Sequence, residues 1–251
     1  MAPRGGTATR TPPLSRFDAA VRLHLAGDLG AAVRAYASVI AADPRCAAAY
    51  NNKGTIHARN GDHATAIPLF RRATELQEEY ADAFHNHGLS AALLGDHATA
   101  IAPLERAVAL DRTRPGWWAD LGNVLVRVQR HEPALAAYDR ALALAPDDAG
   151  VLANRAAALH GLRRHDEAIA ATRAALVRRP DDVDLLQNLG LMLKEVRAYD
   201  EAHAVLSHAH VLAPAHTGVM GHLALLLLDR GALADARALA DALVTDRKSV
   251  V

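Results

Sequence analysis

The sequence is short of cysteine, aromatic residues and net charge. Cys46 is the single cysteine, which excludes an intramolecular disulfide and is typical of a reducing compartment. Phe, Trp and Tyr together make up 4% of the residues, whereas the abundant Ala, Leu and Arg favour helices over sheets. The 28 basic and 28 acidic side chains cancel, so we predict no electrostatic surface for nucleic acid or for an anionic membrane.

Long apolar runs and targeting signals are missing as well. The longest apolar run, Leu223 to Leu228, is far too short to span a bilayer. The N-terminal stretch MAPRGGTATRTPPL has a basic residue but no apolar centre, so it does not resemble a secretory signal. We therefore expect a cytoplasmic protein without a membrane segment, in which residues 1–14 are a disordered N-terminal segment.

One pattern recurs along the chain every 34 residues. A small residue returns at this spacing, as Ala20, Gly54, Gly88, Gly122, Ala156, Gly190 and Ala224. So does an alanine, as Ala32, Ala66, Ala100, Ala134, Ala168, Ala202 and Ala236. A larger residue follows that alanine by four positions, as Tyr36, Phe70, Leu104, Tyr138, Thr172 and Leu206. The pattern defines seven units without insertions, which begin at about residues 13, 47, 81, 115, 149, 183 and 217.

The spacing inside one unit predicts two amphipathic helices joined by a turn. In Leu121-Gly122-x-x-Leu125 the apolar positions recur at helical spacing, and the glycine lets a neighbouring helix approach closely. A turn follows at a glycine such as Gly61, and Pro146 or its equivalent ends the second helix. One hairpin cannot bury both of its faces, so the hairpins should stack on one another.

These residues resemble the tetratricopeptide repeat (TPR) family. The matching features are an aromatic-x-x-Leu-Gly-x-x-Leu/Tyr first helix, an Ala-x-x-x-Phe/Tyr-x-x-Ala second helix and a closing proline. The resemblance implies an all-α, right-handed α-solenoid of seven repeats over residues 15–245. Pro68 and Pro103 depart from it inside the second helices of repeats two and three. Because proline removes a backbone donor, we expect a late helix start or a kink at each.

A polar position lies two residues before the small residue of each first helix. It is occupied by Asp18, Asn52, Asn86, Asp120, Asn154, Asn188 and His222. The resemblance places this position in the concave groove, where an amide can donate to and accept from a peptide unit. The row resembles the asparagine ladder in the TPR superhelix of protein O-linked N-acetylglucosamine transferases, with Asp120 interrupting it. The alternative is that these amides bond their own scaffold.

The other candidate side chains are better explained by packing than by metal binding or catalysis. His63, His97, His131 and His165 share one position after the turn, which Tyr199 takes in repeat six. Equivalent positions in stacked hairpins lie on the order of 10 Å apart, too far for one metal with bonds of about 2 Å. We therefore expect no metal site and no cofactor. The sequence also has no Gly-rich phosphate loop and no Ser or Cys beside a placed base, so we expect no catalysis.

Two further patterns bear on the ligand. Trp118 occupies the usual aromatic position of its hairpin and is expected in the core, whereas Trp117 could face solvent and anchor a partner. A chaperone-type carboxylate clamp requires lysine four residues before the polar position. The residues found there are Leu14, Ala48, Asp82, Gly116, Gly150, Asp184 and Gly218. None is basic, which argues against a chaperone C-terminal tail as the ligand.

Together these patterns predict a non-catalytic protein-interaction module that binds an extended peptide segment of a partner protein in its groove. The alternative is the N-terminal substrate-recognition arm of a larger TPR-containing glycosyltransferase or sulfotransferase, truncated here. Homo-oligomerisation through open solenoid ends is a third possibility. Residues 246–251, Asp-Arg-Lys-Ser-Val-Val, are expected to be a non-native tail, because the start of a common short-read sequencing adapter can encode them.

Overall fold

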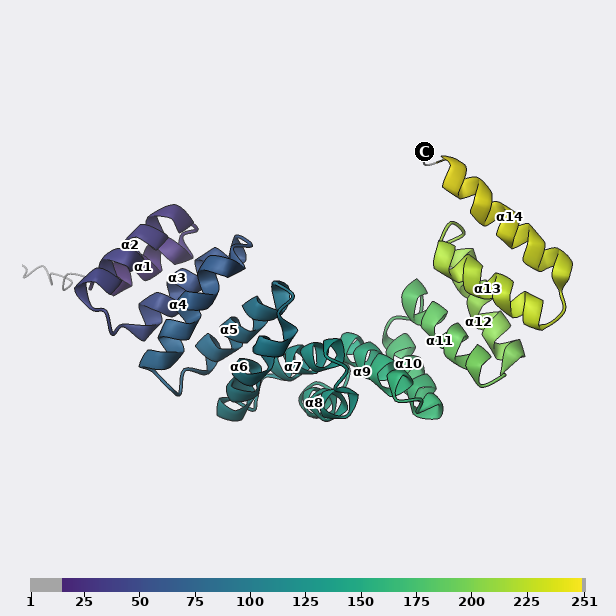
Figure 1. Ribbon diagram of the computed structural model, residues 1–251, viewed down its shortest axis with the longest axis horizontal. Helices are drawn as coiled ribbons and strands as arrows, with labels where there is room; N and C mark the ends of the chain where they lie inside the picture. The colour runs from purple at the N-terminus through teal and green to yellow at the C-terminus, as the bar shows by residue number, and fades with distance from the viewer. Residues whose placement is uncertain (1–14, 250–251) are drawn as a thin grey trace, which may run out of the picture. The chain divides into compact units, whose positions relative to one another are not determined.

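The computed structural model describes residues 15–249, and it folds them into fourteen α-helices (Figure 1). The helices are α1 (Arg16–Leu25), α2 (Leu29–Ala42), α3 (Ala47–Arg59), α4 (His63–Leu76), α5 (Ala81–Leu93), α6 (His97–Leu110), α7 (Pro115–Arg127), α8 (His131–Leu144), α9 (Ala149–Gly161), α10 (His165–Arg178), α11 (Val183–Glu195), α12 (Tyr199–Leu212), α13 (Thr217–Asp229) and α14 (Leu233–Ser249). No strand occurs among these residues, so the predicted all-α class is confirmed. The predicted disordered segment 1–14 and the last two residues lie outside the described range.

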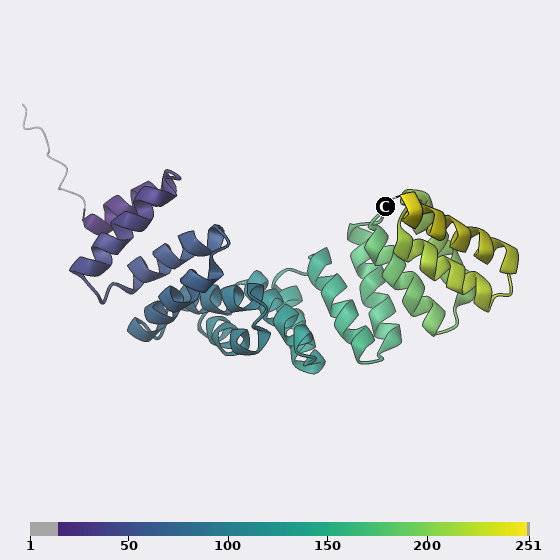
Figure 2. The same cartoon turned by 45° about the horizontal axis from the view of Figure 1, so that its top comes forward.

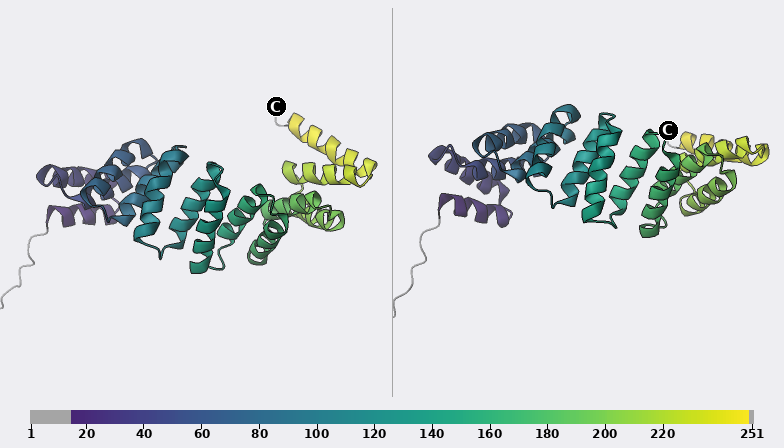
Figure 3. Two further views of the ribbon diagram at one scale, coloured as in Figure 1. Left: turned by 60° about the horizontal axis from the view of Figure 1, so that its bottom comes forward. Right: turned by 90° about the horizontal axis from the view of Figure 1, so that it is seen from below.

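The helices pair into seven hairpins that keep the 34-residue register. From the second hairpin onward, the first helices begin at residues 47, 81, 115, 149, 183 and 217, as the sequence pattern predicted. Figure 2 shows consecutive helices lying side by side within residues 15–111 and within residues 112–249, and Figure 3 shows the last pair, α13 and α14, in yellow. Helix α14 continues through residues 246–249, the first part of the predicted tail. No helix of the described range is long and apolar enough to cross a membrane.

Of the late helix start or kink predicted at the two internal prolines, the late start is wrong and the kink stays a prediction. Helix α4 begins at His63 although Pro68 lies inside it, and α6 likewise contains Pro103. The start of α4 is capped, since the Asp62 carboxylate accepts a hydrogen bond from the backbone N–H of Thr65 at 3.1 Å. The equivalent cap of α6 has the same geometry. Such caps satisfy backbone donors of the first turn. Helices α8, α10 and α12 begin at the same repeat position without a side-chain cap, so the hairpin turn just before this position sets where the second helix begins.

Each hairpin turns at a residue in the left-handed backbone region. Four of these positions are glycines with φ between 79° and 84°, namely Gly27, Gly61, Gly95 and Gly231. The other three are Gln129, Arg163 and Arg197, with φ of 61° or 62°. Hairpins four to six therefore make the same turn as the others with side chains that this conformation disfavours.

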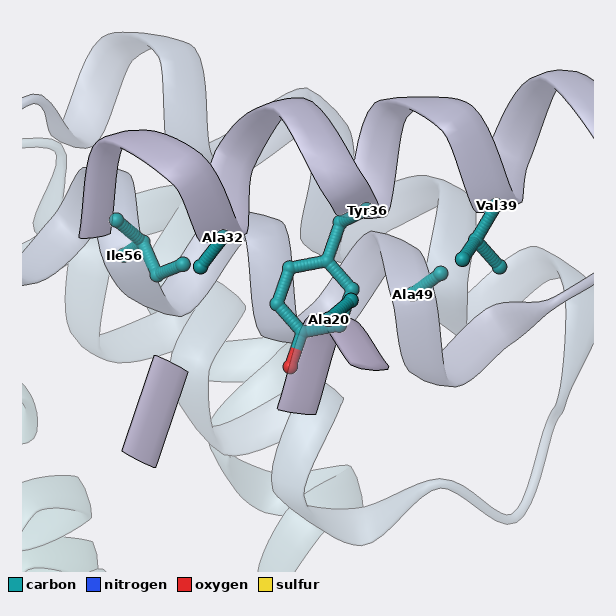
Figure 4. Close-up of a cluster of buried hydrophobic side chains, with 6 residues drawn as sticks. All are labelled: Ala20, Ala32, Tyr36, Val39, Ala49 and Ile56. Carbon is teal, nitrogen blue, oxygen red and sulfur yellow. The ribbon is translucent and has the colours of Figure 1, made fainter. Parts of the chain in front are cut away.

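The core of a hairpin is a small residue facing a larger one sixteen positions later. A Cβ atom on Gly122 would lie 2.5 Å from Cε1 of Tyr138, and one on Gly190 would lie 2.4 Å from Cγ of Leu206. The first hairpin has the same arrangement, with a fully buried Tyr36 ring packed beside Ala20 and Ala32 (Figure 4). The glycines are thus required because the second helix packs directly on their α-carbons.

The described residues form two compact units, one ending at Asp111 with hairpins α1–α6 and one starting at Arg112 with hairpins α7–α14. Within the first unit α3 contacts α5, and within the second α7 contacts α9 and α11 contacts α13. Successive second helices make no comparable contact in the described part of either unit. In these three pairs the first helices therefore lie closer together than the second helices do, which indicates that first helices form the inner face of each stack.

Candidate functional site

The amide side chains of the first unit are bonded to one another. Asn52 Nδ2 donates to the Tyr36 hydroxyl at 3.2 Å, and Asn51 Nδ2 donates to Asn52 Oδ1 at 3.3 Å. Asn86 Nδ2 in turn donates to Asn51 Oδ1 at 3.0 Å. A chain of hydrogen bonds thus runs from the first hairpin to the third. Both ladder candidates of this unit, Asn52 and Asn86, are half-buried and hold their own scaffold together, which is the alternative left open by the sequence.

The ladder candidates of the second unit are more accessible. Asn154 is exposed on α9, and its Nδ2 donates to Asn123 Oδ1 at 2.8 Å. The same oxygen accepts the Tyr138 hydroxyl at 2.9 Å. An asparagine has two N–H donors and an oxygen with two lone pairs, so this bond leaves most of the capacity of Asn154 for a ligand. Asn188 is exposed on α11, and Asp120 is half-buried on α7.

A pocket of about 110 Å³ opens between α9, α10 and α11. It is lined by Ala153, Ala156, Ala157, His160, Thr172, Leu185, Asn188, Leu191 and Met192. The pocket lies beside Thr172, which is smaller than the residues at the same repeat position in the neighbouring hairpins. Tyr138 and Leu206 fill that position there. The Thr172 hydroxyl donates to the carbonyl oxygen of Ala168 at 2.9 Å and so needs no partner in the pocket.

The sequence reasoning did not predict this pocket. The signal was present, since Thr172 is the only small polar side chain among the larger residues that share its position from Tyr36 to Leu206. The pocket brings Asn188 together with apolar residues of two first helices. Asn154 lies on α9 next to the lining residue Ala153, on the exposed side of that helix.

The two tryptophans lie opposite to expectation. Trp117 is 8% exposed and belongs to the core of the second unit, under the guanidinium of Arg114, whose Cζ lies 4.6 Å from the ring centroid. Trp118 is half-buried, and its indole N–H donates to the carbonyl oxygen of Arg112 at 3.2 Å. The position of Trp117 is filled by buried Ala49, Ala83 and Val151 in other repeats, which is the pattern that identifies it as a core position.

The repeated histidines begin the second helices and are half-buried. The Nδ1 atoms of His63, His97, His131 and His165 are buried without a hydrogen-bond partner among the described residues. A Cβ atom on Gly161 would lie 3.0 Å from the His131 ring, so the last residue of one first helix packs on the histidine of the preceding hairpin. One hairpin later that last residue is Glu195, which the structure places against His165 and also against His160.

Burial lowers the pKa of two histidines, one at the polar position of a first helix and one beside it. Desolvation, with a smaller effect of Lys194, lowers the pKa of His222, which occupies the polar position in the seventh repeat. Desolvation and then Arg71 lower the pKa of His87 beside Asn86. Both rings are therefore favoured in the neutral form at pH 7, in which an imidazole has one donor and one acceptor, as an amide does.

Comparison with known proteins agrees with this geometry. The sequence pattern of the tetratricopeptide repeat matches residues 16–83, 64–115 and 119–183, which is more than half of the chain. The chain belongs to the tetratricopeptide repeat family. It is thereby a member of a class of protein-interaction modules, and the predicted family and solenoid fold are confirmed. No curated protein matches the chain in sequence.

Several solved TPR structures are similar to this TPR chain. YrrB, a TPR protein with an unusual peptide-binding site, is 21% identical with a TM-score of 0.69, over 75% of this chain and 97% of YrrB. MamA is 25% identical with a TM-score of 0.61, over 64% and 94%. The C-terminal part of a TPR repeat-containing protein from Cytophaga hutchinsonii is 13% identical with a TM-score of 0.74, over 91% and 94%.

Proposed function

We propose that this TPR protein binds an extended peptide segment of a partner protein along the first helices of its second unit. In this proposal Asn154 and Asn188 bond the peptide backbone, and the pocket between α9, α10 and α11 takes one side chain of the ligand. The observation that carries the proposal is the pocket itself, because an exposed ladder amide, Asn188, forms part of its lining.

The amides suit backbone recognition because of how Asn154 is held. Its bond to Asn123 fixes the side chain, which lowers the entropy lost on binding, and its remaining N–H and oxygen match the two polar groups of a peptide unit. Such bonds read the backbone and not the side chains, so they favour an extended ligand of broad sequence.

The pocket adds a preference for one ligand residue. Its volume of about 110 Å³ is close to that of the ~150 Å³ apolar cavities that accept benzene, so it can take one aliphatic side chain. Alanine, leucine and methionine side chains supply most of its walls, and its polar side chains are His160, Thr172 and Asn188. The similar fold of YrrB, a TPR protein with an unusual peptide-binding site, supports a peptide as the class of ligand.

The test begins with a phage-displayed library of unstructured peptides selected on the full chain, followed by fluorescence anisotropy with the selected peptides. Changing Asn154 and Asn188 together to alanine should weaken binding by about 1–3 kcal/mol, as expected when hydrogen bonds in a partly desolvated site are lost. The free energy of unfolding should change little, because both side chains are exposed.

A companion variant is Asn123→Ala, which removes the acceptor shared by Tyr138 and Asn154 and so tests how far holding Asn154 contributes to binding. It should reduce stability by about 1 kcal/mol or more, because the Tyr138 hydroxyl loses its partner inside the hairpin. If the Asn154/Asn188 double variant binds every selected peptide as well as the parent does, the amides do not form the binding site and the proposal is wrong.

A further inference from the structure

Three side chains with metal-binding atoms converge where hairpins five and six meet. His160 comes from the end of α9, His165 from the start of α10 and Glu195 from the end of α11. His160 Nε2 lies 2.8 Å from Glu195 Oε2, and His165 Nδ1 lies 3.3 Å from the same oxygen. The three ligand atoms all lie within 4.8 Å of one another. We propose that His160, His165 and Glu195 bind a zinc(II) ion that links the two hairpins.

The spacing of the ligand atoms suits a tetrahedral ion. Zinc bonds to nitrogen and carboxylate oxygen of about 2.0–2.2 Å place neighbouring ligand atoms about 3.3–3.6 Å apart at tetrahedral angles. The observed separations from Glu195 Oε2, 2.8 Å to His160 and 3.3 Å to His165, differ from these values by only a few tenths of an ångström. The third pair, His160 Nε2 and His165 Nδ1, lies within 4.8 Å. Two imidazoles and a carboxylate are also a donor set that zinc uses when its fourth position is left to water or to a ligand.

A simple ion pair accounts less well for this arrangement. Oε2 of Glu195 accepts a hydrogen bond from His160. The Nδ1 atom of His165 is buried without a hydrogen-bond partner within residues 15–249, as are those of His63, His97 and His131. What distinguishes His165 is that this nitrogen lies 3.3 Å from the same carboxylate oxygen. A buried polar atom without a partner costs about 1–3 kcal/mol. An ion between the three groups would satisfy that nitrogen and the carboxylate at once.

The cluster depends on a coincidence of three repeat positions. One hairpin earlier, the counterpart of His165 is His131, but Gly161 stands in place of Glu195 and Val126 in place of His160. There His131 Nε2 bonds to Gln129 at 3.0 Å. The histidine position by itself is therefore a packing position, as the sequence indicated, and within residues 15–249 it gains metal ligands only between hairpins five and six.

A bound zinc ion would stabilise the second unit and fix one wall of the pocket. The side chains are 20–33% exposed, so an ion can enter from solvent. Three consecutive helices of the second unit would be tied at their ends. His160 also lines the pocket described above, so the ion would fix one wall of that pocket. The proposal stands without the peptide, since it concerns binding of the ion alone.

Calorimetric titration of zinc chloride into the chelator-treated full chain tests the proposal. We expect one zinc ion per chain to bind more tightly than any other, and Tm to rise by about 5–10 °C at zinc concentrations near 100 times Kd. Cobalt(II) should give the visible bands of a tetrahedral site. Glu195→Gln removes the anionic ligand at an exposed position, where the fold should tolerate it, and should weaken zinc binding at least about tenfold.

His165→Gln should have the same effect, and His131→Gln is the matched control, because it alters the same repeat position without the cluster. Loss of the tight zinc ion in Glu195→Gln and His165→Gln, with retention in His131→Gln, supports the site. Undiminished one-to-one binding in Glu195→Gln would place the ion elsewhere among the histidines and overturn the proposal. The absence of a tight zinc ion on the parent chain would reduce the cluster to an ion pair and overturn it equally.

Discussion

Two glycines of the seventh hairpin should respond in opposite directions to the same substitution. Gly221 lies in the interior of α13, and Gly231 forms the following turn with φ of 79°. A Cβ atom at either position would have no heavy atom of another part of the structure within 4 Å. Packing is therefore the same for both, and only the backbone conformation distinguishes them.

The magnitudes follow from that conformation. In a helix interior alanine is about 0.8–1.0 kcal/mol more favourable than glycine, so Gly221→Ala should stabilise hairpin seven by about 1 kcal/mol. A non-glycine residue in the left-handed region costs roughly 1–2 kcal/mol. Restricting the unfolded chain returns about 0.4–1 kcal/mol of this cost. Gly231→Ala should therefore destabilise the hairpin by about 0.5–1 kcal/mol.

The reverse change is available at Arg197, which is exposed and makes the same turn with φ of 62°. By the same reasoning Arg197→Gly should stabilise its hairpin by about 0.5–1 kcal/mol. Urea unfolding followed by circular dichroism gives the overall change in the free energy of unfolding. Amide hydrogen exchange in α13 and α14 assigns it to the last hairpin, because a repeat array can open locally. A shift of the same sign for Gly221→Ala and Gly231→Ala would refute the reasoning.

Three further predictions concern the small and large residues that pair within hairpins. Gly122→Ala should lower the free energy of unfolding by roughly 1–3 kcal/mol, because the added methyl group overpacks against Tyr138. The control Gly116→Ala adds a methyl group in open space and should not lower it. Urea unfolding measures both. Burial raises the pKa of Tyr138, so its stabilising effect is complete below about pH 10, the usual tyrosine pKa, and is lost as pH rises further. Tyr138→Phe should accordingly flatten the fall in the urea midpoint above about pH 10, and an unchanged alkaline profile would contradict this assignment. Thr172→Leu should fill the pocket, raise the free energy of unfolding by about 1 kcal/mol and abolish any preference of the selected peptides for an aliphatic residue; enhanced peptide binding would argue against the pocket as a side-chain site.

The fold could be predicted from the sequence because every unit repeats the same physical solution in the same register. A small residue such as Gly122 opposite a large one such as Tyr138 fixes how the two helices of a hairpin approach. What the pattern could not show is the balance of local effects. At Pro68 the helix continues although the proline lacks one backbone donor, and at Arg163 the turn requires a left-handed backbone that an arginine side chain disfavours.

Only part of the candidate site could be predicted from the sequence. Comparing equivalent positions predicts a row of amides, but it cannot show bonds between positions that are not equivalent. Asn154 bonds Asn123, a residue whose counterparts in other repeats are not asparagine. Likewise His160 and Glu195 meet across the boundary between two hairpins. These contacts arise from the offset between neighbouring hairpins, which a single unit does not encode.

The departures from the repeat in hairpin five are best understood together. A solenoid gains stability from each hairpin and from each contact between neighbouring hairpins. One loosely packed hairpin can therefore be stabilised by the hairpins on either side. Thr172 gives up the volume that a leucine would fill, while its hydroxyl remains satisfied within α10. The space lost to packing becomes the pocket, and its wall includes an amide from the next hairpin, Asn188, and an imidazole from the same one, His160. A position where a sequence breaks its own packing rule, and still satisfies its polar groups, is where a binding site is to be expected.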